Sequence, residues 1–344
     1  MKSDKTTSFD IAYRAGVSQP TVSRALRNSP LVSKETREKI QAIAKELNYK
    51  IDINARNLRS QSAKTLALLF SEDPGTGDTL INPFFLSMLG SITKASATRG
   101  YDLLISFQQD SDDWGAHYEE THRADGIIFL GYGDYTNYIE KIRRLDEMDA
   151  HFITWGPTLE GQPGHFLGCD NKGSAYTGAK YLAGLGAKKI AFLGDVSEKS
   201  PEFNARYQGF VQALLESKLI IDPELQIDAQ STEESGIQAI EILLQKDIIF
   251  DSVFAASDLI ALGAIKALTD AGLNVPNDVR VMGFDDIPIA AYSAPPLTTI
   301  HQDTILAGEL LVDSLIRLIE GQEVNLKQIP AKLVVRRSCG GKGQ

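Results

Sequence analysis

The chain has 344 residues and a net charge of −10, and 43% of its residues are hydrophobic. This length accommodates a small domain beside one large or two medium domains with a substantial core. Its two cysteines, Cys169 and Cys339, are too few for a disulfide framework, which suits a reducing cytoplasm. The N-terminus MKSDKTTS lacks the apolar stretch of a signal peptide, and no apolar run approaches the about 18 residues of a membrane span. We therefore expect a cytoplasmic protein with no membrane partner.

An early segment of the chain has the pattern of a helix-turn-helix. Thr7 suits the N-cap of a short first helix, and Asp10 follows three residues later, close to a capping box. Gly16 opens a tight turn, because glycine adopts a positive φ without strain. A second helix is predicted over Gln19–Arg27, with Ser18 as its cap. The second helix of such a motif enters the major groove of DNA.

A third helix is predicted to complete a small core, capped by Ser33, with apolar residues at helical spacing up to Leu47 and then Tyr49. Charge supports a role in DNA binding. Residues 1–62 carry twelve Lys or Arg and six Asp or Glu, a balance of +6, so the rest of the chain carries −16. A basic segment on an acidic body is expected where the basic part meets phosphates. The alternative is an ordinary three-helix bundle with a solvated charged surface.

The letters of this segment, DIAYRAGVSQPTVSRALRN and then VSKETREKIQAIAKELNYKIDINARNLRS, resemble the N-terminus of the LacI/GalR (lactose and galactose repressor) family. The similarity covers most positions from Asp10 to Leu58, and the family's pattern continues to about Arg337. This resemblance implies a dimeric, effector-controlled transcription factor, usually a repressor of sugar genes. The residues expected to contact DNA are Thr7, Ser18, Gln19, Pro20, Thr21, Ser23, Arg24 and Asn28 in the helix-turn-helix, and Asn54, Ala55, Arg56 and Leu58 in the hinge.

Residues 51–62 are predicted to be a hinge and linker between two folded parts. Ile53–Leu58 has the composition of a helix, but so short a segment does not hold a helix alone in water, because nucleation is costly. In the family the matching segment folds only as a pair on DNA, where a Leu wedges into a central base step of the minor groove. Leu58 occupies that position. The alternative is that Leu58 packs on the core domain.

From Thr65 onward, predicted strands alternate with helices, which indicates parallel, doubly wound sheets. The run is too long for one sheet, and the resemblance implies two periplasmic-binding-protein-like lobes joined by three crossings, with the ligand between them. The predicted strands are Leu66–Phe70, Leu103–Phe107, Gly126–Leu130, Phe152–Trp155, Lys189–Leu193, Ser252–Ala255 and Val279–Phe284. The predicted helices include Phe84–Thr98, Gly173–Leu185, Ala205–Ser217, Glu233–Gln245 and Asp258–Ala271.

These patterns predict a helix-turn-helix domain at 1–50, a hinge and linker at 51–62, and an effector-binding and dimerisation core at 63–344. Within the core, the first lobe is expected at about 63–164 and 295–329. The second lobe is expected at about 165–294 and 330–344. The three crossings are expected near Gly164, Ala294 and Ile329, and the ligand near the carboxyl ends of the strands.

The candidate effector site has aromatic, cationic and carboxylate members. Asn82, Phe84 and Phe85 follow the first strand, and the rings suit the apolar face of a sugar. Arg206 matches a family arginine that grips the effector, since an Arg fork holds adjacent hydroxyls or a carboxylate. Asp285 matches the family's hydroxyl-binding aspartate. The other residues expected to line the site are Trp155, Asp170, Glu202, Gln230 and Ser257.

Several of these residues have a structural alternative. One of the two Phe suits packing at the start of a helix, and Trp155 suits the core. Arg206 is also compatible with the surface of a helix, and Asp170 with an N-cap. Asp286, next to Asp285, is expected to cap a helix or contact a lobe.

The sequence has no P-loop, no nucleophile elbow and no histidine spacing for a metal, so we expect no enzyme activity, no cofactor and no metal site. We predict a homodimeric repressor of carbohydrate-utilisation genes that binds a palindromic operator. Its effector is expected to be a neutral mono- or disaccharide. The site offers one cation, Arg206, against the carboxylates of Asp170, Glu202 and Asp285, so a doubly charged sugar phosphate would meet net repulsion. The alternatives are an activator or a co-repressor-dependent regulator with a purine or sugar phosphate effector, and a sugar-binding transport protein.

Overall fold

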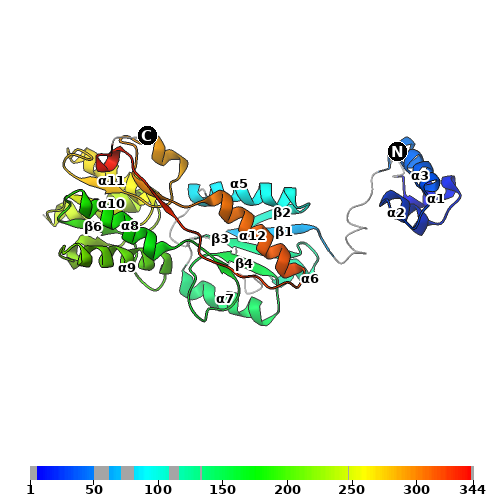
Figure 1. Ribbon diagram of the computed structural model, residues 1–344, viewed down its shortest axis with the longest axis horizontal. Coiled ribbons are helices and arrows are strands. Elements are labelled where there is room, and N and C mark those ends of the chain that lie inside the picture. Colours follow the sequence, from blue (N-terminus) through cyan, green and yellow to red (C-terminus); the bar gives the residue numbers. More distant parts are fainter. Residues whose placement is uncertain are drawn as a thin grey trace. The chain divides into compact units, whose positions relative to one another are not determined.

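The computed structural model describes residues 6–49, 62–70, 81–107, 116–131, 134–246 and 248–341. The chain divides into two compact units, Met1–Ser62 and Ala63–Gln344. Figure 1 shows helices α1, α2 and α3 in the first unit and sheets flanked by helices in the second. This combination confirms the predicted fold class, a helix-turn-helix domain followed by an α/β core of parallel sheets.

The first unit contains α1 (Ser8–Ala15), α2 (Gln19–Leu26) and α3 (Lys34–Glu46). The capping box is present, because the Thr7 hydroxyl accepts from the Asp10 backbone N–H and the Asp10 carboxylate accepts from the Thr7 backbone N–H at 2.7 Å. Gly16 ends α1 with a φ of 72°. Ser18 occupies the N-cap position of α2, but its hydroxyl contacts the Thr21 hydroxyl at 2.9 Å, so the predicted side-chain cap is absent.

The core of this unit is built from the apolar faces of the three helices. Ile11, Val22, Ala25 and Ile40 are buried together, and Tyr49 packs against them as predicted. Burying one such aliphatic side chain stabilises a fold by about 1.5–3 kcal/mol. The core leaves the polar side of α2 outside.

The first sheet of the second unit is parallel, with strand order β2-β1-β3-β4-β5. Its strands are β1 (Thr65–Phe70), β2 (Asp102–Phe107), β3 (Gly126–Leu130), β4 (Phe152–Trp155) and β5 (Phe166–Leu167). Its helices are α5 (Pro83–Thr98), α6 (Ala116–Glu120), α7 (Tyr135–Glu147) and α12 (Thr304–Ile319). Leu66 and Leu68 share a cluster with residues of α5 and α12, whereas Ala67 and Leu69 share another with residues of α7. Successive side chains of β1 thus serve opposite faces, as a sheet covered on both sides requires. We call this group the first lobe (Figure 1).

The second sheet is also parallel, with strand order β7-β6-β8-β9. Its strands are β6 (Ile190–Leu193), β7 (Gln226–Ile227), β8 (Ser252–Ala255) and β9 (Arg280–Met282). Its helices are α8 (Asn171–Gly184), α9 (Pro201–Glu216), α10 (Glu233–Gln245) and α11 (Asp258–Asp270), with short 3-10 turns η1 (Pro223–Leu225), η2 (Pro288–Ala291) and η3 (Arg337–Cys339). The backbones of α8 and α9 touch at Gly209, where an added Cβ would lie 2.0 Å from the carbonyl oxygen of Lys172. We call this group the second lobe.

The segments that connect the lobes form an antiparallel pair, β10 (Thr299–His301) with β11 (Lys332–Val334). The first crossing follows β5, because β5 still pairs with β4 in the first sheet. The second follows β10, because Thr298 and His301 bridge Met282 and Asp285 beside the second sheet. Both crossings lie after Gly164 and Ala294, the residues expected from the sequence. The reason is that two short strands, β5 and β10, come before the crossings. Ile329 bridges Cys169 at the third crossing.

The described ranges contain no helix that is long and apolar enough to cross a membrane. Within the same ranges, no three His, Cys, Asp or Glu side chains are grouped so that they could hold a metal ion.

Candidate functional site

Arg206 lies on α9 with only 1% of its surface exposed. Its Nε donates to Oδ1 of Asn171 at 2.8 Å, and its Nη1 donates to the carbonyl oxygen of Ala256. Its Cζ lies 3.8 Å from the centroid of the Phe284 ring, a cation–π contact. These contacts exclude the surface alternative for Arg206 and fix the orientation of its planar fork.

Asp285 follows β9 and faces this guanidinium, with 3.7 Å between its Oδ1 and Nη1 of Arg206. Gln302 donates from Nε2 to the same oxygen at 2.7 Å. Burial raises the pKa of Asp285 to about 7, although Arg206 and the Gln302 hydrogen bond act to lower it. The backbone of Asp285 has a φ of 117°, a conformation that residues other than glycine rarely adopt because it is sterically strained. Strain and a buried, perturbed carboxylate occur together at functional sites.

A second buried carboxylate, Asp258, begins α11 and holds the loop that follows Asp285. Its Oδ2 accepts from the backbone N–H of Ile287 at 2.8 Å, and its Oδ1 accepts from the Thr299 hydroxyl at 2.6 Å. Burial and then the charge of Asp285 raise the pKa of Asp258. Since both oxygens are occupied by the protein, Asp258 supports the loop of Asp285.

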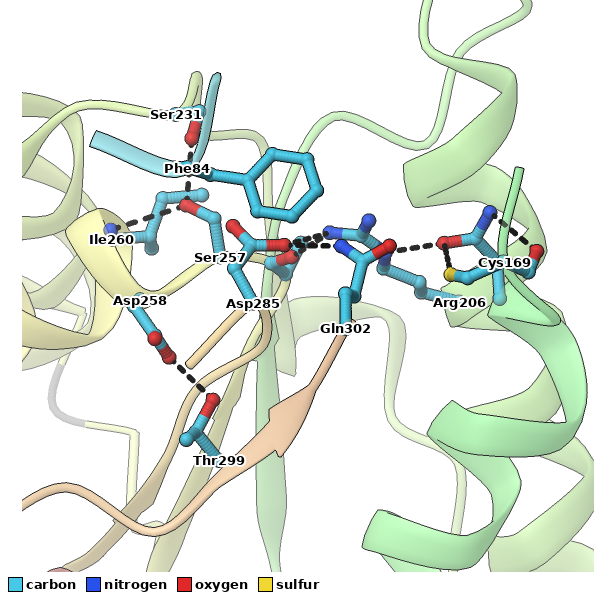
Figure 2. A network of polar contacts seen from close by, with 12 residues as sticks. Phe84, Cys169, Arg206, Ser231, Ser257, Asp258, Ile260, Asp285, Thr299 and Gln302 are labelled. Atoms are coloured by element: carbon cyan, nitrogen blue, oxygen red, sulfur yellow. Dashed lines mark hydrogen bonds and ion pairs between the residues drawn. The ribbon is translucent and has the colours of Figure 1, made fainter. Parts of the chain in front are cut away.

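A chain of side-chain hydrogen bonds connects the two lobes beside these groups. Asn82 of the first lobe donates from Nδ2 to the Ser231 hydroxyl at 3.1 Å, and that hydroxyl lies 2.9 Å from the Ser257 hydroxyl. Asn82 also caps α5, accepting from the Phe84 backbone N–H at 2.9 Å. In Figure 2 the Phe84 ring points toward the group formed by Asp285 and its partners.

The three predicted aromatic residues are all buried in the first lobe. The ring centroids of Phe84 and Phe85 are 5.2 Å apart, and those of Phe84 and Trp155 are 6.1 Å apart. All three belong to the large hydrophobic cluster of the second unit.

The remaining predicted residues have different surroundings. Asp170 caps α8, because its Oδ1 accepts from the Gly173 backbone N–H at 2.8 Å. Glu202 is half-buried in the first turn of α9, and burial raises its pKa despite the opposing charge of Arg206. Gln230 is exposed. Asp170 is therefore an N-cap, which was the structural alternative for this residue. Glu202 lies near enough to Arg206 for the charge of the guanidinium to affect its pKa.

Sequence reasoning did not select Asn171, Asp258 or Gln302 for this site. Asn171 is adjacent to Asp170, and Asp258 is adjacent to Ser257, so neighbours of the selected residues carried a signal. Gln302 joins the site because His301 bridges Asp285. A bridge between segments so far apart in sequence leaves no local pattern.

The predicted DNA-contacting residues of the helix-turn-helix lie at or near the start of α1 and along α2. Arg24 is exposed on α2. Gln19 donates from Nε2 to the Ser8 hydroxyl at 3.2 Å, which fixes its side chain at the junction of the two helices. Asn28 has a φ of 57° and accepts from Nε2 of Gln41 at 2.8 Å. The other predicted contacts of this unit are Thr7, Ser18, Pro20, Thr21 and Ser23, all exposed or half-buried. The hinge residues Asn54, Ala55, Arg56 and Leu58 lie outside the described residues.

Comparisons with known proteins agree with both parts of this arrangement. Residues 9–52 match the model of bacterial regulatory proteins, lacI family, and residues 179–339 match the model of the periplasmic binding protein-like domain. The chain is 30% identical over 336 residues to the HTH-type transcriptional repressor PurR of Histophilus somni (strain 129Pt), an alignment that covers 96% of this chain and 97% of that protein. This chain belongs to the lacI family.

Solved structures of other regulators resemble this lacI-family protein over nearly its whole length. A lac repressor dimer bound to operator and the anti-inducer ONPF has a TM-score of 0.83 and 27% identity, covering 98% of this chain and 99% of that chain. A complex of the transcriptional regulator CelR with cellobiose has a TM-score of 0.70 and 28% identity, covering 97% and 99%. The family membership makes this protein a DNA-binding transcriptional regulator and places it among regulators rather than enzymes.

Proposed function

We propose that this lacI-family regulator is a cytoplasmic, homodimeric repressor whose binding to a palindromic operator is controlled by a small neutral sugar. The observation that carries the proposal is the buried pair of Arg206 and Asp285, with the Phe84 ring directed toward it from the other lobe (Figure 2). A guanidinium donates and a carboxylate accepts, so together they bind adjacent hydroxyls of a sugar. An aromatic ring packs on the apolar face of the same ligand.

Charge supports a neutral ligand. The guanidinium of Arg206 faces the carboxyl group of Asp285, with Glu202 near it and Asp258 next to Asp285. A phosphate would add two negative charges to this group at low dielectric, where like charges repel strongly. A sugar hydroxyl brings no charge and both donates and accepts. The solved CelR complex holds cellobiose, and this supports a sugar among the ligands to be tested.

Access to the site requires the lobes to separate. Arg206 and Asp285 are 1% and 3% exposed, and Phe84 is 1% exposed. The lobes contact each other through Asn82 and Ser231 and through an ion pair of 3.2 Å between Lys199 and Asp134. A ligand that binds between the lobes therefore changes their relative position, which is the means by which it controls the operator.

The proposal is tested by titrating the operator-bound protein with a panel of mono- and disaccharides, purine bases and hexose phosphates. Fluorescence anisotropy of a labelled operator follows release, and a thermal shift of the free protein follows binding. We expect a neutral sugar both to raise the melting temperature and to release the operator. Release by a hexose phosphate alone would reject the neutral-sugar proposal. Tighter operator binding with a purine would favour a co-repressor.

Two variants locate the site. Arg206→Ala and Asp285→Ala should each fold and bind operator, yet fail to respond to the sugar that releases the wild-type protein. Lys246→Ala is the matched control, because it removes a cation of the second lobe that is paired with Glu224 at an exposed site. A normal sugar response of either site variant would contradict this account of the pocket.

A further inference from the structure

The chain enters the first lobe through a carboxylate clamp. Oδ1 of Asp125 accepts from the backbone N–H of Ala63 at 2.5 Å, and Oδ2 accepts from the backbone N–H of Lys64 at 2.9 Å. The backbone N–H of Asp125 donates to the carbonyl oxygen of Thr65 at 2.8 Å. One residue, placed just before β3, thus binds three consecutive residues that lead into β1.

Lys64 is held by further contacts at the same place. Its carbonyl oxygen accepts from the backbone N–H of Asp102 at 2.9 Å. Its Nζ lies 4.4 Å from the ring centroid of Tyr101 and donates to the Tyr101 hydroxyl at 3.2 Å. Its φ of 51° turns the backbone into a conformation that a non-glycine residue adopts only when the surroundings enforce it. The direction of the chain at this point is therefore fixed.

The second lobe carries a related clamp in the corresponding position, in which a single carboxylate oxygen accepts both backbone N–H groups. Oδ2 of Asp251, just before β8, accepts from the backbone N–H groups of Lys188 and Lys189 at 2.8 and 3.3 Å, which lead into β6. The backbone N–H of Asp251 donates to the carbonyl oxygen of Lys189 at 3.0 Å. The two clamps differ in what precedes them. Asp251 holds a segment inside the core, whereas Asp125 holds the first residues after the segment that joins the core to the DNA-binding unit.

We propose that Asp125 is a positioning residue for operator binding. It fixes the point and direction in which the chain that leads to the DNA-binding unit, the segment before Ala63, leaves the first lobe. This inference rests on the proposed function for its regulatory meaning. The chain that precedes Ala63 is the covalent connection between the first lobe and the DNA-binding unit, and a free junction would absorb a movement of that lobe. The clamp makes the junction move with the first lobe.

Asp125→Asn and Asp251→Asn form a matched pair that separates positioning from stability. An Asn side chain offers one acceptor oxygen, so Asp125→Asn loses one of its two backbone contacts, whereas Asp251→Asn can keep both backbone contacts of Oδ2 and turn its NH₂ group toward the Ser252 hydroxyl. We expect both variants to fold, and their melting temperatures measure how much stability each one loses. We expect Asp125→Asn alone to lose at least about fivefold in affinity for the operator, a palindrome selected with the wild-type protein from a random DNA library. Affinity for a scrambled duplex should stay within about twofold of wild type.

Lys64→Gly provides a second measurement that does not depend on weakening the clamp itself. Glycine accepts the positive φ and keeps both backbone donors but frees the junction, so operator affinity should fall, with only the small loss of melting temperature that removal of the contact between the exposed Lys64 and Tyr101 causes. Equal operator affinity of Asp125→Asn and Asp251→Asn would overturn the proposal. Unchanged operator binding by Lys64→Gly would also overturn it, including when Asp125→Asn does not fold. The operator readout needs no sugar, so a failed sugar response would reject the proposed function and leave this test standing.

Discussion

Asp285 combines backbone strain with a buried, perturbed carboxyl group, so the role that we propose for it is opposed by its cost in stability. Its φ is 117° and burial raises its pKa to about 7. A folded pKa above the unfolded value of 3.8 means that the folded state binds the extra proton between those two pH values. The group therefore destabilises the fold progressively as pH rises from about 4 to 7, by at most about 1.4 kcal/mol per pH unit.

Asp285→Asn should remove this pH dependence. We expect the difference in unfolding free energy between variant and wild type to shift in favour of the variant as pH rises from 5 to 8, because asparagine carries no charge. Urea unfolding at several pH values measures it. The sugar response of the variant should be lost. A difference that does not change with pH would show that Asp285 remains ionised throughout this range.

In the DNA-binding unit, Arg24 is the residue that we expect to contribute most to recognition of the operator. It is exposed on α2, and an arginine there suits O6 and N7 of guanine in the major groove. Arg24→Ala should weaken operator binding by about 1–3 kcal/mol at fixed salt. Arg14→Ala is the control, because Arg14 on α1 is paired with Glu46 at 2.5 Å. Wild-type operator affinity in Arg24→Ala would show that α2 is not the recognition helix.

At the scale of elements, the packing of α12 on α5 depends on one glycine. A Cβ added to Gly308 would lie 2.6 Å from the Cβ of Ser91 and 2.9 Å from the backbone nitrogen of Ile92. Gly308→Ala should therefore destabilise the protein by about 1–3 kcal/mol, because two helices must separate. Gly90→Ala, on the open side of α5, meets no atom within 4 Å and should stabilise it by about 0.5–1 kcal/mol. Chemical denaturation compares the two, and equal effects would contradict the close approach.

Most of the long elements were predicted from sequence, although the helices α7 and α12 were not named, and the shortest strands were missed. Ile127–Leu130 is an unbroken apolar run, and the strand predicted there has the bounds of β3. By contrast, β5 and β7 have two residues each, too few to show any period, and they form only because a neighbouring strand pairs with them. The first lobe crossing lies later in the chain than predicted for the same reason, because it follows β5.

The site shows the same division. Arg206 and Asp285 were selected through the family resemblance, and the structure brings them within 3.7 Å of each other. Gln302 was not selected, because only the pairing of β10 with distant segments brings it to Asp285. The Ser18 cap failed because the nearby Thr21 hydroxyl competes for the Ser18 hydroxyl. Local patterns thus predict elements and caps, and long-range pairing decides which side chains meet.

At the scale of the whole molecule, the DNA-binding unit and the core of one chain carry net charges of opposite sign. Residues 1–62 carry +6 and the remainder −16. The neutral sugar that we propose would add no charge to the core, so its effect on the operator would come through conformation. If both ligands shift one equilibrium of the lobes, their coupling is reciprocal. Saturating sugar then changes operator affinity by the same factor as saturating operator changes sugar affinity.

We expect this factor to correspond to about 1–3 kcal/mol. Isothermal titration of the releasing sugar into free and operator-bound protein gives one side of the comparison. Anisotropy of the labelled operator with and without sugar gives the other side. Both must be done at one salt concentration, because release of counterions changes operator affinity steeply with salt. Two unequal factors would contradict a single equilibrium, since a change in assembly would then have to accompany one of the two binding steps.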